Sequence, residues 1–377
     1  MSEWKECKLG EVAQSANTGL DAIKRAPIVD KNTGIKCLRI QDVSQLKKFN
    51  DWGFTEVEKR NFDKFQLKKN DIFIARTGAS VGVNIIIKND LQSVFNNGLI
   101  RIRANEKICD AKYLYYNFRT PNYNCFIESI SGGTSTQPNM QINVLLSYDI
   151  LLPPLPEQKA IASVLSSLDD KIDLLHRQNK TLEAMAETLF RKWFLPAEAS
   201  VQVGMDGKLG DVIDLVYGKG LKEEIRTGAG FPVVGSSGIV GYHSEYFVEG
   251  PGIVIGRKGT LGKVIYLWEN FFPIDTTYFV KSKLNSKGLY YEYFLLKTLN
   301  FEDMNSDSAV PGLNRDIALL SEINIPPTES IKEFDIQCSN IFNKICANNN
   351  QIRTIEKLRD NLLPKLMSGE VRVLNLD

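Results

Sequence analysis

Residues 151–173 read Leu151-Leu-Pro-Pro-Leu-Pro-Glu-Gln-Lys-Ala-Ile-Ala-Ser-Val-Leu-Ser-Ser-Leu-Asp-Asp-Lys-Ile-Asp173, a double-proline break followed by the start of a long apolar repeat. Proline fixes φ and removes a backbone donor, so Pro153-Pro154 ends a folded part, whereas Pro156-Glu157-Gln158 suits the first turn of a helix. Apolar or small residues then recur at steps of three and four: Ile161, Leu165, Leu168, Ile172, Leu175, Leu182, Ala186, Leu189 and Trp193. This spacing predicts a coiled-coil seam, in which Asn179 fills one gap and either sets the register or faces solvent.

The same layout occurs twice in the chain. Residues 138–193 align without a gap with residues 311–366, because Pro153-Pro154 falls on Pro326-Pro327, a shift of 173 (326 − 153). The second helix carries its own seam, interrupted by Asn348 and Arg359: Phe334, Cys338, Ile341, Ile345, Ile352, Ile355, Leu362 and Leu366. The repeat predicts a duplicated, pseudo-two-fold molecule whose two long helices pack antiparallel as a spacer.

Each copy has a β-rich part upstream of its helix. Both parts begin alike, with Lys8-Leu-Gly-Glu-Val12 and Lys208-Leu-Gly-Asp-Val212, and continue through apolar runs that predict strands, Asp71-Ile-Phe-Ile-Ala-Arg76 and Gly252-Ile-Val-Ile-Gly-Arg257. A short helix is predicted at 111–118 and again at 287–294. A loop then leads to a buried strand, at 146–152 and again at 319–325.

These elements predict an α+β fold in which two mixed, β-rich domains are separated by two long antiparallel helices. The predicted segments are a first domain at 1–152, a helical spacer at 153–197, a second domain at 198–325 and a second spacer at 326–377. Residues 195–207 are expected to be the linker between the copies.

Composition limits the class of protein. The chain has 377 residues, 43% of them hydrophobic, which is enough for two or more domains with real cores. The formal net charge of +1 excludes binding through a highly charged tail, so a nucleic-acid surface must be local. The N-terminus is polar, no apolar run is long enough to cross a membrane, and the six cysteines include no CxxC pair. These features predict a cytoplasmic protein with reduced thiols.

No catalytic or metal-binding constellation is evident in the sequence. The only histidines, His176 and His243, have no Cys or His neighbours at zinc spacing. The segment Gly256-Arg-Lys-Gly-Thr-Leu-Gly-Lys263 has the wrong glycine spacing for a phosphate loop, and Val264 stands where a metal-binding hydroxyl is needed. We therefore predict a protein without catalytic residues, without a metal and without a bound cofactor.

Two glycine-rich turns repeat a polar pattern. Arg76-Thr-Gly-Ala-Ser-Val-Gly82 and Arg257-Lys-Gly-Thr-Leu-Gly262 each follow an apolar strand. Glycines let the backbone approach a partner closely, and arginine can bind phosphates or guanine. The alternative is a plain hairpin turn with a solvated arginine. The predicted DNA contacts on these turns are Arg76, Thr77, Ser80, Arg257, Lys258, Thr260 and Lys263.

A second polar loop also repeats. Ser131-Gly-Gly-Thr-Ser-Thr-Gln-Pro-Asn-Met140 matches Ser306-Asp-Ser-Ala-Val-Pro-Gly-Leu-Asn314, and small hydroxyl and amide side chains suit phosphates and base edges. The alternative is a turn that only connects a helix to the last strand. The predicted DNA contacts on these loops are Thr134, Ser135, Thr136, Gln137, Ser308 and Asn314.

The chain resembles the specificity subunits of type I restriction-modification systems. The resemblance rests on the segment at 151–173, on Leu189-Phe-Arg-Lys-Trp-Phe194, on the two glycine-rich turns and on Ser135-Thr-Gln-Pro-Asn139. Together with the repeated layout, these motifs cover nearly the whole chain. The second copy departs from the pattern, because Pro326-Pro-Thr-Glu-Ser-Ile lacks the Glu-Gln pair.

The resemblance implies a non-catalytic subunit for DNA recognition. Each domain would read one half of a split site in double-stranded DNA, and the helices would set the gap and dock two adenine-N6 methyltransferase subunits. S-adenosylmethionine, ATP and Mg²⁺ would then bind to the methyltransferase and restriction subunits rather than to this chain. A scaffold whose two modules bind only proteins is the alternative. The expected partner contacts are Glu157, Gln158, Phe190, Trp193, Phe194, Leu363 and Leu366.

Overall fold

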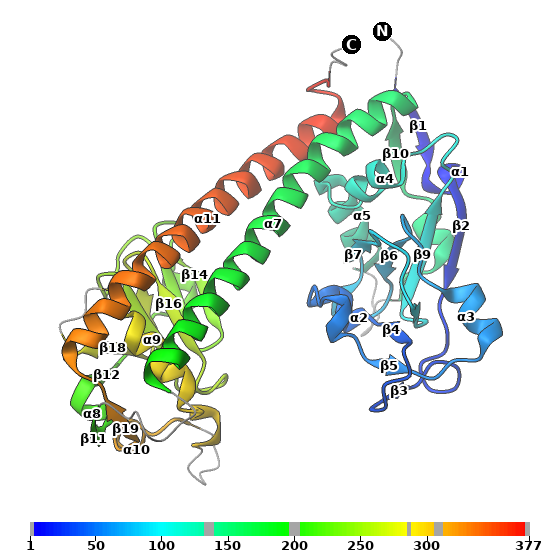
Figure 1. Ribbon diagram of the computed structural model, residues 1–377. Coiled ribbons are helices and arrows are strands. Elements are labelled where there is room, and N and C mark those ends of the chain that lie inside the picture. Colours follow the sequence, from blue (N-terminus) through cyan, green and yellow to red (C-terminus); the bar gives the residue numbers. More distant parts are fainter. Residues whose placement is uncertain (1–3, 132–138, 196–203, 285–287, 305–311, 374–377) are drawn as a thin grey trace. The chain divides into compact units, whose positions relative to one another are not determined.

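The chain folds into two compact units, each with its own α+β domain (Figure 1). The computed structural model describes residues 4–131, 139–195, 204–284, 288–304 and 312–373. Unit 1 comprises residues 1–173 and 353–377, and unit 2 comprises residues 174–352. Each long helix therefore contributes one part to each unit. The functional boundaries predicted at 152, 197 and 325 stay a prediction.

The main sheet of unit 1 has four antiparallel strands in the order β2-β9-β6-β7. Its central strand β6 is buried along its whole length because side chains on its two faces enter different cores. Ile72 and Ile74 join the core beneath the long helices, whereas Phe73 and Ala75 join a second core. This alternation follows from the two-residue period of a strand. The strands are β2 (Ala13–Thr18), β6 (Ile72–Ala75), β7 (Asn84–Ile86) and β9 (Leu99–Ala104).

The second core of unit 1 lies beneath a smaller sheet in the order β3-β5-β4-β8. Its strands are β3 (Ile28–Val29), β4 (Lys36–Leu38), β5 (Phe54–Thr55) and β8 (Ser93–Phe95), with β4 and β8 parallel. Short helices connect these strands: α2 (Ile40–Ser44), the 3₁₀ turn η1 (Phe49–Asp51) and α3 (Lys59–Phe65).

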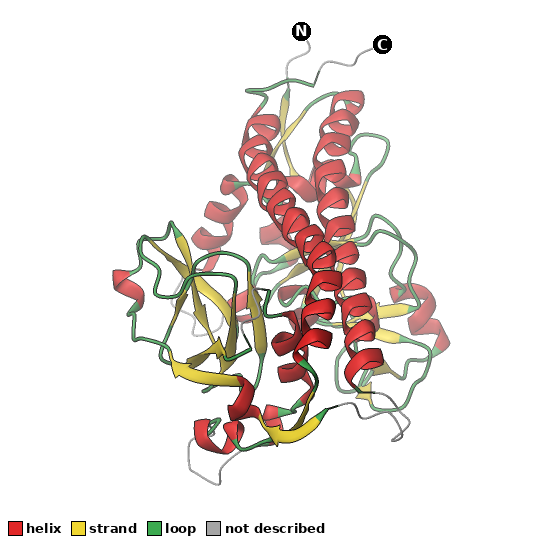
Figure 2. Ribbon diagram, turned by 60° about the vertical axis from the view of Figure 1, so that its left-hand side comes forward, coloured by secondary structure: helices red, strands yellow, loops and turns green. Residues whose placement is uncertain are grey.

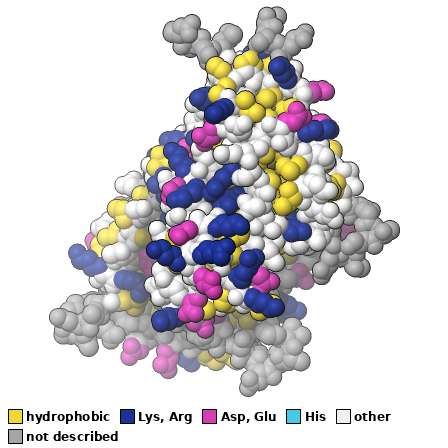
Figure 3. Space-filling model, turned by 90° about the vertical axis from the view of Figure 1, so that its right-hand side faces the viewer, with side chains coloured by type: hydrophobic (Ala, Val, Ile, Leu, Met, Phe, Trp, Pro, Cys, Tyr) yellow, Lys and Arg dark blue, Asp and Glu magenta, His cyan; other side chains and the backbone are white. Residues whose placement is uncertain are grey.

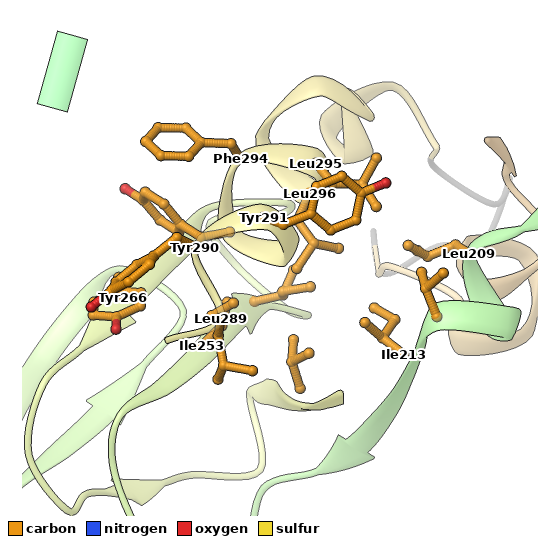
Figure 4. Close-up of a cluster of buried hydrophobic side chains, with 14 of the residues drawn as sticks. Leu209, Ile213, Ile253, Tyr266, Leu289, Tyr290, Tyr291, Phe294, Leu295 and Leu296 are labelled. Carbon is orange, nitrogen blue, oxygen red and sulfur yellow. The ribbon is translucent and has the colours of Figure 1, made fainter. Parts of the chain in front are cut away.

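Unit 2 repeats this topology, although its smaller sheet has three strands among the described residues where that of unit 1 has four. Its main sheet has the order β12-β18-β15-β16, and its smaller sheet has the order β14-β13-β17. Ile253 and Ile255 of β15 enter one core and Val254 enters another, as the equivalent residues of β6 do. Figure 4 shows Ile213 and Ile253 facing the same core as the side chains of helix α9. The strands are β12 (Ile213–Tyr217), β13 (Phe231–Gly235), β14 (Gly238–His243), β15 (Gly252–Gly256), β16 (Val264–Leu267), β17 (Phe272–Pro273) and β18 (Thr277–Ser282).

A two-stranded ladder closes each domain. It pairs β1 (Lys5–Lys8) with β10 (Asp149–Leu152) in unit 1, and β11 (Met205–Lys208) with β19 (Glu322–Ile325) in unit 2. Two expectations need correction here. The last strands are shorter than predicted, because the short helices α6 (Ile142–Leu146) and α10 (Arg315–Leu319) precede them. The predicted linker also ends earlier, because Met205 already pairs with Ile325.

The predicted short helices are confirmed as α4 (Ala111–Asn117) and α9 (Tyr290–Thr298), although α9 extends beyond the expected end. The Asp110 carboxylate caps α4 by accepting from the backbone N–H groups of Lys112 and Tyr113. Other helices among the described residues of the domains are α1 (Leu9–Val12), α5 (Pro121–Ser131) and α8 (Leu209–Val212), with 3₁₀ turns η2 (Gly78–Ser80), η4 (Glu223–Ile225) and η5 (Phe301–Asp303).

The two predicted long helices are confirmed as α7 (Leu155–Phe194) and α11 (Thr328–Ser368), which lie side by side in Figures 1 and 2. They run antiparallel within each unit. In unit 1, Glu157 bonds Arg372 while Asp169 bonds Arg359. In unit 2, Asn179 bonds Asn349, whereas Phe190, further along α7, packs on Phe334, near the start of α11. Ten of the seventeen predicted seam residues are buried. The other seven are half-buried: Leu168, Leu182, Leu189, Trp193, Ile341, Ile355 and Leu362.

Candidate nucleic-acid interface

The arginine turn of unit 1 leaves the end of β6. The backbone N–H of Arg76 donates to the carbonyl of Gly98 (3.0 Å), and its own carbonyl accepts from the N–H of Met140 (2.8 Å). The guanidinium Nη2 donates to Oδ1 of Asn139 (2.9 Å). Gly82 has a positive φ of 88°, and a Cβ there would meet the Ile127 side chain at 2.8 Å, so this position requires glycine.

The arginine turn of unit 2 is built in the same way. The N–H of Arg257 donates to the carbonyl of Thr276 (2.9 Å), and its carbonyl accepts from the N–H of Leu313 (3.0 Å). The side chain, however, is held differently. Its guanidinium lies 4.9 Å from the ring centroid of Tyr217 and 5.8 Å from that of Tyr278, and Nη1 donates to the carbonyl of Asp275 (3.1 Å). Stacking and this hydrogen bond fix the plane of the guanidinium.

The structure therefore brings each arginine turn beside the segment that precedes α6 or α10. Thr77 forms a bridge with Asn139, and Lys258 forms one with Gly312. The described ends of the two polar loops therefore lie beside the arginine turns, and their contact with DNA stays a prediction. Thr134, Ser135, Thr136, Gln137 and Ser308 lie outside the described residues.

The other predicted DNA contacts differ in their burial and in their hydrogen-bond partners. Thr77 and Ser80 are half-buried in the turn of unit 1, whereas Lys258 and Thr260 are exposed. Lys263 is exposed and its ammonium donates to the carbonyl of Ser237 (2.6 Å). The carbonyl oxygen of the exposed Asn314 side chain accepts from two backbone N–H groups and caps α10, leaving its amide NH₂ as the group that can reach outward.

Sequence reasoning missed Tyr217, Asn139 and Asp275 as neighbours of the arginines. Tyr217 is 51% exposed and ends β12, directly across from Tyr278. Tyr278 is buried, and its hydroxyl donates to the Leu313 carbonyl. Burial raises the pKa of Tyr278 to about 12, so the hydroxyl stays protonated. No sequence spacing marked these pairs, because they join strands far apart in the chain.

Basic side chains also gather at the other end of β6. Figure 3 shows lysine and arginine side chains spread over one face of the molecule. Lys68, Lys69, Arg103 and Lys107 line a pocket of about 440 Å³ at the start of the strand. The buried Asp71 carboxylate accepts two hydrogen bonds from Arg103 (2.5 and 3.1 Å). Hydrogen bonding to Asp71 raises the pKa of the Arg103 guanidinium above its ordinary value. One positive charge of the pocket is thereby compensated.

The Glu-Gln pair at the start of α7 holds the helix to its own domain. Gln158 is completely buried, donates to the carbonyls of Ile108 (3.0 Å) and Pro153 (2.8 Å), and accepts from the N–H of Asp110 (2.8 Å). Glu157 accepts from Nε1 of Trp4 (3.1 Å) and from the Arg372 guanidinium. In the second copy, the position of Gln158 is taken by Ile331, which is buried in the core of unit 2.

The other predicted partner contacts are also packed against the protein itself. Phe190 is 1% exposed, and its ring lies 5.8 Å from Phe294 and 5.9 Å from Phe334. Trp193 and Phe194 pack around the same cluster. Leu363 and Leu366 are buried in the core of unit 1. A direct partner contact by these residues stays a prediction, and their role in the structure is to anchor the helices.

A polar layer interrupts the helix seam in unit 2. Asn348 is 1% exposed and donates to Oδ1 of Asn179 (2.8 Å), while Asn179 donates to Oδ1 of Asn349 (2.7 Å). Asn179 is therefore paired across the seam, and of the two roles left open by the sequence this geometry supports register setting.

Neither histidine sits in a metal site within the described ranges. His176 is exposed on α7, and the ring of His243 lies edge-on to Phe272. In those parts of the chain, no three His, Cys, Asp or Glu side chains are grouped to hold a metal ion. No helix among the described residues is both long and apolar enough to span a membrane.

Two domains of one topology, each with an arginine turn and joined to an antiparallel helix pair, define a duplicated recognition protein. Residues 1–184 and 205–357 match the type I restriction modification DNA specificity domain. This match covers most of the chain, which therefore belongs to the type I restriction-modification DNA specificity family. The resemblance noted in the sequence is confirmed.

Named relatives agree with this assignment. The chain is 28% identical over 340 residues to the type I restriction enzyme MjaIX specificity subunit of Methanocaldococcus jannaschii, covering 79% of this chain and 77% of that protein. It is 25% identical over 355 residues to the MjaVIII specificity subunit of the same organism, covering 82% and 81%. The crystal structure of the S subunit from a type I restriction-modification system of M. genitalium has the same fold, with a TM-score of 0.61 and 20% identity over 97% of this chain and 96% of that one.

Proposed function

We propose that each unit reads one half of a split site in double-stranded DNA and that the chain itself catalyses no reaction. The observation that carries this proposal is the pair of arginine turns. Arg76 and Arg257 have the same backbone bonds, so both units present an arginine at one place in one fold. Their side-chain neighbours differ, Asn139 in one unit and two tyrosines in the other. A shared frame with different contacts suits two unlike half-sites.

The chemistry of the turns fits DNA. A guanidinium can bond guanine bidentately or bind a phosphate, and hydroxyl and amide side chains can form hydrogen bonds with the edges of bases. The net charge of +1 fits a subunit that shares phosphate binding with partners. The alternative, a scaffold that binds only proteins, leaves the arginine turns and the membership in a DNA specificity family without a reason.

We infer that two methyltransferase subunits dock on exposed parts of the helix pair, with the restriction subunits joining the assembled complex. A shallow groove of about 410 Å³ crosses the helices within unit 2, and Arg177, Gln178, Thr181 and Lys344 form the polar part of its lining. Its lining includes Leu174, which is 38% exposed, and Leu182. The assembled complex would then bind S-adenosylmethionine, ATP and Mg²⁺ on those other subunits, which do the chemistry.

The decisive experiment expresses this chain with its methyltransferase and maps methylated adenines by single-molecule sequencing. We expect one split motif with a constant gap. An unsplit motif, or methylation that does not depend on this chain, would contradict the proposal. Duplex binding by the complex should also fall steeply with salt, whereas a protein-only scaffold would show no such slope.

A domain exchange separates the two units. Replacing residues 1–150 with those of a relative should alter one half of the motif and leave the other half and the gap unchanged. If both halves changed, or neither, the assignment of one half-site to each unit would fail. Reading the motif by methylation also shows that the exchanged protein has folded and assembled.

A further inference from the structure

The smaller sheets of the two units share a frame. In unit 1, β4 runs parallel to β8 and antiparallel to β5. In unit 2, β13 runs parallel to β17 and antiparallel to β14. Strand β4 is therefore the counterpart of β13, and β5 is the counterpart of β14. The connections between the paired strands can be compared directly.

These connections differ more than the strands that they join. In unit 2, only Ser236-Ser237 separates β13 from β14. In unit 1, residues 39–53 separate β4 from β5 and contain α2 and η1. One unit therefore has a tight hairpin where the other has a helical insertion.

Both connections lie against the arginine turn of their own unit. In unit 2, Lys263 donates to the Ser237 carbonyl, and a Cβ on Gly259 would lie 3.4 Å from Oγ of Ser236. In unit 1, Cδ1 of Ile40 lies 2.6 Å from where a Cβ would stand on Gly98, whose carbonyl accepts from the N–H of Arg76. Helix α2 also contacts β6 and β7. Whatever binds at the arginine is beside these connections.

The insertion in unit 1 is anchored firmly. Asp42 is completely buried and accepts from the backbone N–H and from Nε of Arg39, each at 3.0 Å. The buried Lys36 ammonium donates to the carbonyls of Asn50 (2.7 Å) and Trp52 (2.9 Å). A loop held in this way presents its outer side chains with little conformational freedom. The exposed side chains of the insertion are Gln41, Ser44, Gln45, Leu46, Lys48, Asn50 and Asp51.

We propose that these connections are the elements that make the two half-sites differ, an inference that rests on the function proposed above. In unit 1, the exposed side chains of Gln41 in α2 and of Gln45 at its C-terminal end carry amide groups. Glutamine can bond adenine bidentately in a major groove. In unit 2, the tip presents the Ser237 hydroxyl, followed by the exposed apolar side chains of Ile239 and Val240. A hydroxyl group can form hydrogen bonds with different bases, and apolar side chains contact the methyl group of thymine.

The test uses the full chain assembled with its methyltransferase and a library of randomised duplexes. Gln45→Ala should lower the preference for one base in one half-site by about 5- to 150-fold, the effect of losing a bidentate pair. Ser237→Ala should change the other half-site, by a smaller factor. Gln92→Ala is the matched control, because Gln92 is exposed just before β8, at the end of that strand away from Arg76.

The outcomes separate this inference from the proposed function. A change confined to one half-site, absent in the control, supports it. Three outcomes would overturn the inference while leaving the split-site function intact. The first is uniform weakening on all sequences, and the second is a change in both half-sites. The third is an unchanged preference in both Gln45→Ala and Gln41→Ala. If the unaltered complex selects no split site, the proposed function fails and the inference fails with it. Equal thermal midpoints confirm that the variants are folded.

Discussion

The hydroxyl group of Tyr116 on α4 donates to the Asp169 carboxylate on α7 at 2.7 Å. Asp169 also accepts from Arg119 (3.2 Å) and from Arg359 of α11 (2.8 Å), so a single carboxylate joins the domain of unit 1 to both long helices. Unit 2 uses the same device, because Tyr293 of α9 donates to Glu183 of α7 at 2.6 Å. In each unit, a tyrosine–carboxylate bond fixes the domain to the helix pair.

Tyr116→Phe should lower the free energy of unfolding of the protein by about 1–3 kcal/mol, because it removes a hydrogen bond to a charged group. Urea unfolding, followed by circular dichroism, measures this change. Tyr115→Phe is the matched control, since the Tyr115 ring packs 5.3 Å from that of Tyr116, whereas the Asp169 carboxylate accepts from the hydroxyl of Tyr116. Equal losses in both variants would show that the bond to Asp169 contributes nothing specific.

Acid should weaken unit 2 through Glu183. Burial alone would raise the pKa of this carboxyl group, but hydrogen bonds from Tyr293 and Lys297 outweigh it and leave the pKa below its ordinary value of 4.5. The stabilising contribution is therefore present above the unfolded-state pKa and is lost as pH falls through the folded-state pKa. We expect Glu183→Gln to flatten the fall in stability between about pH 5 and pH 3. A fall as steep as that of the unaltered protein would contradict the assignment.

Arg257→Ala should cost about 1–3 kcal/mol of binding and relax the preference at one base pair, if the guanidinium reads a base. Uniform weakening on all sequences would instead place it on a phosphate. Selection from randomised duplexes distinguishes these outcomes.

Tyr217→Leu should produce a weaker version of the Arg257→Ala effect, about a 2- to 5-fold loss of discrimination, because it removes the ring on which the guanidinium stacks. Tyr217→Phe keeps the ring and should behave like the unaltered protein. If Tyr217→Phe is as damaging as Tyr217→Leu, the hydroxyl rather than the stack is the functional group.

The asparagine layer should act as one unit. Asn179→Leu leaves Asn348 and Asn349 without their partner in the seam and should cost about 1–3 kcal/mol of stability. The double variant Asn179→Leu/Asn348→Leu should recover part of this loss, because two leucines pack together in the seam and the buried amide of Asn348 is no longer left without a partner. Lys180→Leu, at an exposed neighbour, controls for the added leucine. Additive losses in the double variant would argue against a coupled layer.

Helices and central strands could be predicted because their residues repeat at a fixed period. The three–four spacing from Ile161 to Trp193 located α7, and the unbroken apolar run of β6 located the sheet. Helix α2 could not be predicted, since five residues carry no helical period. Gln158 was expected at a partner surface, yet its amide satisfies three backbone groups inside unit 1, and sequence does not reveal which buried groups need a partner.

The sequence by itself determined the duplication, the helix pair, the arginine turns and the family, because each rests on local spacing or on motifs that recur along the chain. Only the tertiary structure decided what surrounds each arginine. Asn139 reaches Arg76 and Tyr217 reaches Arg257 through long-range strand and loop contacts. Such neighbours depend on how strands pair in space, and no periodicity in the chain records that pairing.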